Sequence, residues 1–440
     1  MRKLAKMLLV CCAFCLRLLK WIGIAVFVVF MAAFTVLTLR PDAPPPEDAD
    51  LRIAFEATAE DENAWYFFKL AGDCVVVPEG REESYTYRHL LDEGDKSTWN
   101  SEFAARVVEE NDAPRVHLAR GLACPGCRVA NPFDFDTIFG DVKGFREVAR
   151  VSTVRGRWLL EQGESREAVA QLLQVVRVGS RIQASGGPMI CYVSGVLHKQ
   201  VALRELRRAL AAPGLDGLFL RRMLEDLADC GASVEALTNV YKLEYWWAVA
   251  NLDDPNFGAR AESESTKTGK RRGKTLLYKP NKTKRLVART VRLMIESASE
   301  TYADAELPDV AHELSSPWSL RYYLNGNAVG IITHDMLMGA VPTTHLLKCR
   351  ENCAVAATRI LIALRCYQLD RGKLPETLDE LVPEYLQSVP LDDFDGKPMK
   401  YTKEKKVVYA VGKDLTDNGG IERRRGFNDD GYDLIYKIEF

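Results

Sequence analysis

The spacing of apolar residues divides the chain into an apolar N-terminal stretch, a long region of helical periodicity and a short C-terminal region with strand-like patterns. Trp21 to Leu39 are 19 consecutive residues without a charge. At ~1.5 Å rise per residue such a helix is ~28 Å long, about the hydrocarbon thickness of a bilayer. We therefore expect a transmembrane helix over residues 21–39, preceded by a cytoplasmic leader over residues 1–20.

The charges that flank this stretch predict its orientation. Basic residues precede it, namely Arg2, Lys3, Lys6, Arg17 and Lys20, and a Pro-rich acidic linker follows over residues 40–50. Because basic residues mark the cytoplasmic side, we expect a single-pass inner-membrane protein whose bulk is periplasmic or extracytoplasmic. The alternative is a cleaved signal peptide, but its apolar core is shorter, ~7–15 residues, and ends at small residues. The sequence from Leu37 to Arg40 does not fit such a cleavage site.

Helical periodicity dominates residues 51–348, which we interpret as an α-helical extracytoplasmic domain. Gly163 separates two apolar stripes that predict an antiparallel pair of helices, and Ser165 is a candidate cap of the second. The expected helices cover Glu62–Leu70, Phe145–Gln162, Ala168–Gly179, Val193–Ala211, Leu218–Asp229, Ser233–Leu252 and Leu286–Ala305. Tyr245, Trp246 and Trp247 on one of them are assigned to the core.

A basic stretch interrupts this region. Arg260 to Arg289 holds 11 Lys or Arg against two Glu, and we expect an exposed loop over about residues 259–284. Such a loop, including Arg260–Arg285, is either a solvated surface loop or a contact with anionic lipid or polymer.

The C-terminal region, residues 349–440, predicts a small α+β module. A helix over Cys349–Asp370 is followed by a turn at Gly372 and a short helix with a capping box at Thr377 and Glu380. Three strands are expected over Met399–Thr402, Val407–Val411 and Leu434–Ile438, and we expect an antiparallel sheet. The predicted fold class is therefore mainly α, with one transmembrane helix and a small three-stranded antiparallel sheet near the C-terminus.

Composition narrows the classes of function. With 440 residues, 47% of them apolar, the chain is long enough for two or three domains. Lys and Arg number 59 against 61 Asp and Glu, a net charge of −2. Binding to nucleic acid through an excess of positive charge is therefore not expected.

No catalytic motif is complete. Residues 269–275 resemble a phosphate-binding loop, but only three positions separate Gly269 and Gly273, where four are needed. His312-Glu313 begins a zinc-protease motif, but Ser316 stands where the second His is required. The alternative of an extracytoplasmic hydrolase would need a site in the helical domain, with His117, His198 or His334 beside an acid.

Eight cysteines lie beyond the predicted membrane helix: Cys74, Cys124, Cys127, Cys191, Cys230, Cys349, Cys353 and Cys366. The spacing of Cys124 and Cys127 fits a structural disulfide, a metal site, a redox motif or free thiols. His345, Cys349 and Cys353 recur every four residues, either as part of a zinc site that Cys124 and Cys127 would complete or as a helical stripe that faces the core.

Fixed offsets near the C-terminus carry a family resemblance. The chain has an aromatic residue before a Gly turn, a Leu-Pro, a Leu-rich short helix, a Pro-x-Asp-x-Phe-x-Gly-x-Pro turn and a Tyr-x-x-Gly-x-Asp motif. These residues are Tyr367, Gly372, Leu374, Pro375, Leu378, Leu381, Pro390, Asp392, Phe394, Gly396, Pro398, Tyr401, Tyr409, Gly412 and Asp414. In these features the module resembles the globular C-terminal domain of the major pseudopilin of type II secretion. Asp393, Phe394 and Ala410 depart from the family's Pro, Trp and Ser. The whole chain resembles large exported proteins of planctomycete-type bacteria that carry this module.

The resemblance implies a calcium site, because the family binds Ca²⁺ in the loop after its last motif. Calcium takes six to eight oxygen ligands, and the matching loop here offers carboxylates and amides. The candidate ligands are Asp414, Asp417, Asn418, Asn428, Asp429, Asp430 and Asp433. An acidic turn-rich loop without an ion is the alternative, since Arg423, Arg424 and Arg425 could neutralise it.

Together these features favour a membrane-anchored, non-enzymatic envelope protein with an interaction or scaffold role. We expect it to contact the membrane through Trp21–Leu39 and a protein partner through its helical domain. A component related to type II secretion is a further alternative. The sequence identifies no small-molecule ligand.

Overall fold

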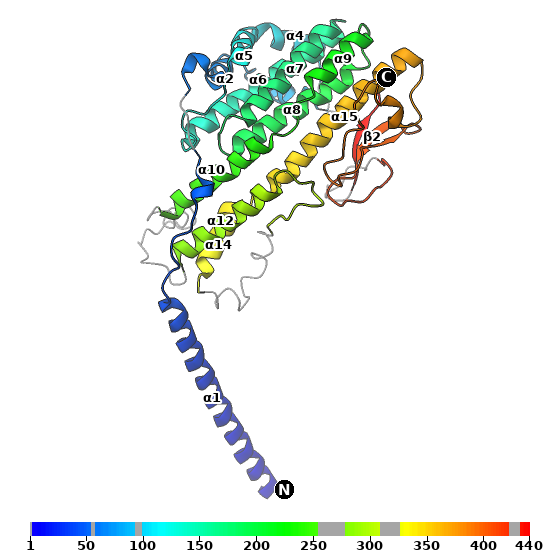
Figure 1. Ribbon diagram of the computed structural model, residues 1–440. Helices are drawn as coiled ribbons and strands as arrows, with labels where there is room; N and C mark the ends of the chain where they lie inside the picture. The colour runs from blue at the N-terminus through cyan, green and yellow to red at the C-terminus, as the bar shows by residue number, and fades with distance from the viewer. Residues whose placement is uncertain (1, 54–57, 93–98, 254–277, 309–325, 422–431) are drawn as a thin grey trace. The chain divides into compact units, whose positions relative to one another are not determined.

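The computed structural model describes residues 2–53, 58–92, 99–253, 278–308, 326–421 and 432–440. The predicted fold class is confirmed: the chain is mainly helical, with one apolar N-terminal helix and a small three-stranded antiparallel sheet near the C-terminus (Figure 1). The helices are α1 (Arg2–Leu39), α2 (Ala64–Asp73), α3 (Arg81–His89), α4 (Ser101–Glu110), α5 (Ala113–Ala123), α6 (Phe135–Glu161), α7 (Ser165–Gln183), α8 (Met189–Ala209), α9 (Gly217–Asp226), α10 (Val234–Asp253), α12 (Pro280–Ser297), α14 (Ala328–Met338) and α15 (Thr343–Arg371). Short 3₁₀ turns are η1 (Ala49–Leu51), η2 (Glu60–Glu62) and η4 (Leu378–Leu381).

The chain divides into two compact units, and each unit is made of three segments that are separate in the sequence. One unit comprises Met1–Asp50, Ala248–Thr290 and Asp309–Gly339, and the other comprises Leu51–Trp247, Val291–Pro308 and Ala340–Phe440. The boundary predicted between residues 348 and 349 falls inside α15. The C-terminal strands therefore belong to the same compact unit as most of the helical bundle.

The larger unit is built on the predicted antiparallel helix pair. Gly163 ends α6 with a φ of 81°, in the left-handed region, and α7 then returns along it. α7 packs on α8 at a contact between glycines: a Cβ on Gly179 would lie 2.7 Å from the carbonyl oxygen of Gly195. Because neither helix carries a side chain at this point, the two backbones approach closely.

A buried ion pair lies beside this contact. Lys199 of α8 and Glu351 of α15 are both fully buried, and their charged groups meet directly. Gln183 of α7 donates to the second Glu351 oxygen at 2.9 Å, and Lys199 also donates to the carbonyl of Cys230 at 3.0 Å. Burial is the main cause that raises the pKa of Glu351, and Lys199 acts against it.

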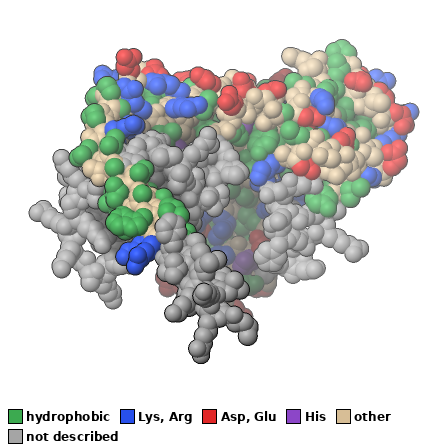
Figure 2. All heavy atoms as spheres, turned by 90° about the horizontal axis from the view of Figure 1, so that it is seen from below, with side chains coloured by type: hydrophobic (Ala, Val, Ile, Leu, Met, Phe, Trp, Pro, Cys, Tyr) green, Lys and Arg blue, Asp and Glu red, His purple; other side chains and the backbone are tan. Residues whose placement is uncertain are grey.

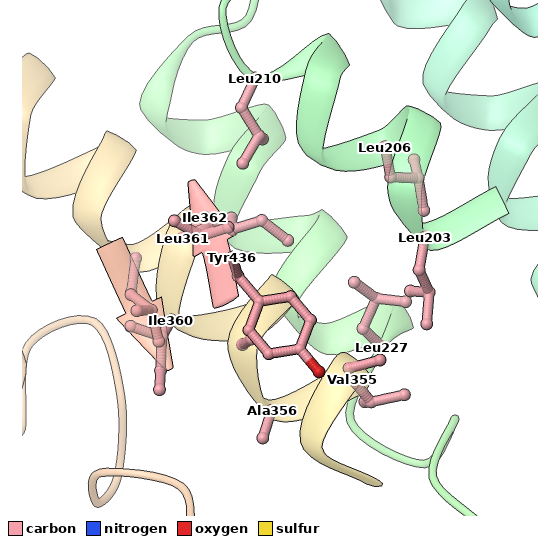
Figure 3. Packing of buried hydrophobic residues seen from close by; sticks show 14 of the residues in the cluster. Leu203, Leu206, Leu210, Leu227, Val355, Ala356, Ile360, Leu361, Ile362 and Tyr436 are labelled. Carbon is pink, nitrogen blue, oxygen red and sulfur yellow. The ribbon is translucent and has the colours of Figure 1, made fainter. Parts of the chain in front are cut away.

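The C-terminal half of α15 forms the centre of the largest apolar cluster. Figure 3 shows Val355 of α15 beside Leu227 and the ring of Tyr436, with Leu203 and Leu206 of α8 on the same side. Tyr436 comes from β3, so the same cluster joins the helices to the sheet. Burying such side chains contributes roughly 1.5–3 kcal/mol each before entropy is counted.

The sheet runs in the order β1 (Lys400–Thr402), β2 (Val407–Ala410) and β3 (Leu434–Lys437), with both pairings antiparallel. The central strand β2 is buried along its length and lies against α15 (Figure 1). Asp392 holds this arrangement together: its carboxylate accepts the amides of Phe394 and Val411, and the thiol of Cys353 lies 3.4 Å from it. The predicted capping box of Thr377 and Glu380 is present, at the start of η4.

The smaller unit holds α1 and the part of α12 that packs with α14. α1 contains one stretch, Arg17–Val36, that is long and apolar enough to cross a membrane, and none of it is buried within the structure.

Over the described surface seen in Figure 2, basic and acidic side chains are interspersed. A partner that is attracted by charge must therefore be recognised locally.

The buried ion pair gives a stability prediction. The Lys199→Met variant should lose about 3–5 kcal/mol in its free energy of unfolding, because Glu351 then stays buried without a counter-charge. The double variant Lys199→Met/Glu351→Leu should recover most of this loss, since no charge remains to be desolvated. Urea unfolding of the full chain in detergent micelles, followed by circular dichroism, measures both. A single variant as stable as the wild type would contradict the role of the pair.

Candidate functional site

The described part of the acidic loop folds around its own carboxylates. Asp433 accepts the amides of Asn418 at 3.2 Å and Gly420 at 2.8 Å. Asp417 accepts the amide of Gly419 at 2.8 Å and the hydroxyl of Tyr409 at 3.2 Å. These bonds turn the loop so that Asp417 lies near Asp433. The hydroxyl of Tyr409 connects the loop to strand β2 of the sheet.

Negative charge accumulates at this place. The pKa of Asp433 is raised, first by burial and then by the neighbouring charges of Asp417 and Asp414. Burial and the charge of Asp417 likewise raise the pKa of Tyr409 to about 12. A bound cation would relieve this repulsion.

Four of the seven predicted calcium ligands, Asp414, Asp417, Asn418 and Asp433, are thus located in one loop. Asn428, Asp429 and Asp430 lie outside the described residues, as do Arg423, Arg424 and Arg425. Within the described parts of the chain, no group of three or more His, Cys, Asp or Glu is arranged to hold a metal ion. The calcium site stays a prediction.

Cys124 and Cys127 are buried free thiols. Cys124 directly follows the last residue of α5, so it lies at the negative end of that helix rather than at a start that would stabilise a thiolate. Burial raises the pKa of Cys124, and it raises the pKa of Cys127 to about 12. Of the four interpretations that the spacing allowed, the structure shows free thiols, and their raised pKa values oppose redox activity.

The stripe of His345, Cys349 and Cys353 faces the core, as the second of its two interpretations predicts. All three side chains are fully buried in α15. The two cysteines belong to the apolar cluster around α15, whereas Cys124 and Cys127 belong to another cluster around α2 and α6. The structure therefore does not bring the two groups together, and a joint zinc site is wrong for these residues.

The three histidines proposed for a hydrolase lie in different surroundings. His117 is half-buried on α5, and His198 of α8 is buried with no hydrogen-bond partner among the described residues for either ring nitrogen. Burial lowers the pKa of His198 to about 4. A neutral, unpartnered imidazole in an apolar core has no group with which to exchange a proton, so His198 is a packing residue.

His334 does lie in a hydrogen-bonded chain. Its Nε2 is 2.8 Å from the hydroxyl of Thr290, and its Nδ1 is 2.7 Å from a carboxylate oxygen of Asp335. Each of the three residues is only 4% exposed. The two cavities found beside α7 are lined by other residues. These hydrogen bonds connect α12 to α14. Neither cavity exposes the three side chains to a substrate.

The segment that follows α1 is bound to the folded chain, which the sequence did not reveal. Asp42 accepts the amides of Asn281 at 2.8 Å and Lys282 at 3.2 Å, in the first turn of α12. Asn281 donates back to the carbonyl of Ala43, and Arg285 donates to that of Pro44. Asp42 thus has the role of a helix-capping residue, although it lies 239 positions earlier in the chain. Local sequence patterns contain no signal for such a cap.

The sequence matches no protein-family model, and neither the curated proteins nor the solved structures include a significant match to it. What the chain does must therefore be argued from its own residues.

The buried histidines predict a pH dependence. Burial lowers the folded-state pKa of His198 and of His345 to about 4, against an ordinary value of about 6.5. Below pH 6.5 the unfolded chain therefore binds protons that the folded chain does not. As the pH is lowered, the free energy of unfolding should decrease by about 1.4 kcal/mol per pH unit for each histidine. Unfolding free energies measured from pH 6.5 to 5 should decline less steeply in His198→Leu, and least in His198→Leu/His345→Leu. Equal slopes in all three proteins would contradict the assignment.

Proposed function

We propose that this chain is a single-pass inner-membrane protein with a non-enzymatic interaction or scaffold role outside the cytoplasm. The observation that carries the proposal is that the segment directly after the apolar helix α1 is hydrogen-bonded to the folded chain. An unburied apolar helix of this length is suited to a bilayer rather than to water. Since Asp42 and its neighbours are hydrogen-bonded to α12, the exit from that helix is part of the fold and not a free tether.

The basic residues in the first half of α1, before its uncharged stretch, support a cytoplasmic N-terminus, which leaves the helical bundle and the sheet on the other side. The bundle has no complete catalytic group among its described residues whose parts meet at a cavity. What it offers instead is a rigid helical surface, which suits contacts with another protein. We assign the C-terminal sheet, with the turn at Asp392, to a pseudopilin-like module on the strength of the sequence resemblance.

We also propose that calcium stabilises this module. The support is the mutual repulsion of Asp414, Asp417 and Asp433, together with the backbone bonds that already bring them together. Asn428, Asp429 and Asp430 would complete the ligand set.

The anchor predicts a defined behaviour in cells. The full chain should stay in the membrane after an alkaline carbonate wash and should keep its intact N-terminus. External protease should digest the C-terminal part while sparing an N-terminal tag. The control Val28→Arg/Val29→Arg should lose membrane retention, because each Arg at the centre of a span costs about 2.5–3.5 kcal/mol. A soluble product that starts just after residue 38 would identify a signal sequence instead.

The calcium proposal predicts a shift in thermal stability. Calcium should stabilise the full chain in detergent micelles relative to a chelator, by about 2.7 kcal/mol at a hundred times Kd. The Asp414→Ala variant should lose this gain while folding normally, because that exposed carboxylate accepts a single amide among the described residues, from Thr416. The matched variant Asp379→Ala, in the same module but outside the loop, should keep the gain. No shift at millimolar calcium would refute the site.

A further inference from the structure

Helix α1 is longer than a bilayer requires. It runs without interruption over 38 residues, from Arg2 to Leu39 (Figure 1). At ~1.5 Å per residue it is ~57 Å long, against ~30 Å for the hydrocarbon core of a bilayer. The uncharged stretch Trp21–Leu39 is long enough to fill that core. The first half of α1, residues 2–20, therefore needs another environment, and we call it the leader helix.

The charges of the leader helix lie on one face. A helix turns by ~100° per residue, and the five basic positions all fall within an arc of ~100° around its axis. These residues are Arg2, Lys3, Lys6, Arg17 and Lys20. The first acidic residue of the chain is Asp42, beyond the end of α1, so no carboxylate within the helix offsets these five charges.

The opposite face of the leader helix is apolar. Steps of four and three residues place a row of apolar positions there, namely Leu4, Leu8, Cys11, Cys15 and Leu18. At the end of this row, where the side chains are described, Leu18 is 51% exposed and Leu19 is 64% exposed. An amphipathic helix whose polar face is entirely basic is typical of segments that bind a membrane surface.

A second copy of the helix would also cover the apolar face, because steps of four and three residues suit a coiled coil. Such pairing would give the five basic residues no counter-charge. A leaflet with anionic lipids satisfies both faces, since its acyl chains accept the apolar row and its phosphates accept the charges. The leader helix also continues directly into the uncharged stretch, which keeps it at the membrane.

We propose that the leader helix binds anionic phospholipid headgroups of the leaflet through which α1 enters the bilayer. Transmembrane helices tilt by up to ~40°, and a tilt brings the apolar row against the acyl chains without a break in α1. The long Arg and Lys side chains then extend to the headgroups. Because a single face is charged, lipid binding fixes the direction of the tilt. The inference rests on the proposed membrane anchor and names the lipid that it recognises.

Thiol labelling of the full chain in lipid nanodiscs tests this orientation. In a Cys11→Ser/Cys12→Ser background, Cys15 reports on the apolar face, and Ala13→Cys/Cys15→Ser moves the thiol to the basic face. The discs contain equal amounts of phosphatidylcholine and phosphatidylglycerol, and a water-soluble maleimide is the reagent. Position 15 should react about tenfold more slowly than position 13, because the reactive thiolate does not form among acyl chains. Peptide mass spectrometry separates the leader thiol from the other cysteines, and unfolding in SDS should equalise the two rates.

The charge of the lipid should control this difference. In discs of phosphatidylcholine alone the ratio of the two rates should fall about threefold, and Arg2→Gln/Lys3→Gln/Lys6→Gln should lower it equally in the anionic discs. The matched control Arg88→Gln/Arg222→Gln/Lys373→Gln removes three exposed charges outside the leader helix and should keep the full ratio. Equal rates at positions 13 and 15 in anionic discs, or a ratio that neither change lowers, would overturn the inference.

Two further outcomes separate this inference from its alternatives. Discs that hold one chain each exclude a second copy, so protection of Cys15 that occurs only with two chains per disc would assign the apolar row to helix pairing and overturn lipid binding. An intact chain in the membrane fraction with equal labelling rates would leave the proposed anchor standing and overturn only the lipid contact. A mass that shows loss of residues 1–20 from the protein purified from cells would overturn both.

Discussion

The fully buried ion pair of Lys199 and Glu351 is the interaction on which the larger unit depends. Two charges removed from water are tolerated only where their partners are fixed in place. Here Gln183 of α7 and the carbonyl of Cys230 complete the set, so three helices and the segment after α9 meet at one point. The close approach of α7 and α8 at Gly179 allows this geometry. The pair also connects the bundle to the C-terminal sheet, since α15 supports β2.

Sequence patterns predicted the helices and strands that bury one clear face of apolar side chains. They missed the helices that do not. The helices α6 to α10, the strands and the capping box of Thr377 were found, because their signals are local and repeated. The helices α3, α4, α5 and α14 were not predicted; α3 and α4 are short and bury few side chains, whereas α14 is too apolar to show a clear stripe. Ser165 was expected to cap α7, but Glu164 occupies the capping position and the Ser165 hydroxyl has no partner. The cap that Asp42 provides for α12 depends on residues 239 positions apart, which only the tertiary fold brings together.

The candidate sites differ in the same way. The acidic loop was noticed because its carboxylate and amide residues are close in sequence; the structure shows how Asp417 and Asp433 turn its described part, and the calcium site stays a prediction. Contacts between residues far apart in sequence were not predictable, because only the tertiary fold brings their helices side by side. His334 illustrates the converse, since its hydrogen-bonded neighbours Thr290 and Asp335 resemble a catalytic group, yet burial leaves them a structural role.

The cysteines bear on whether the proposed location is chemically reasonable. An oxidising compartment favours disulfides, whereas all eight cysteines beyond α1 are free thiols and seven of them are buried. Disulfide formation and oxidation proceed through the thiolate, and burial raises the pKa of each buried thiol, for Cys127 to about 12 and for Cys366 to about 11. These raised pKa values leave little thiolate in the interior. Packed in this way, the thiols behave as small apolar side chains, and their free state is compatible with an extracytoplasmic bundle.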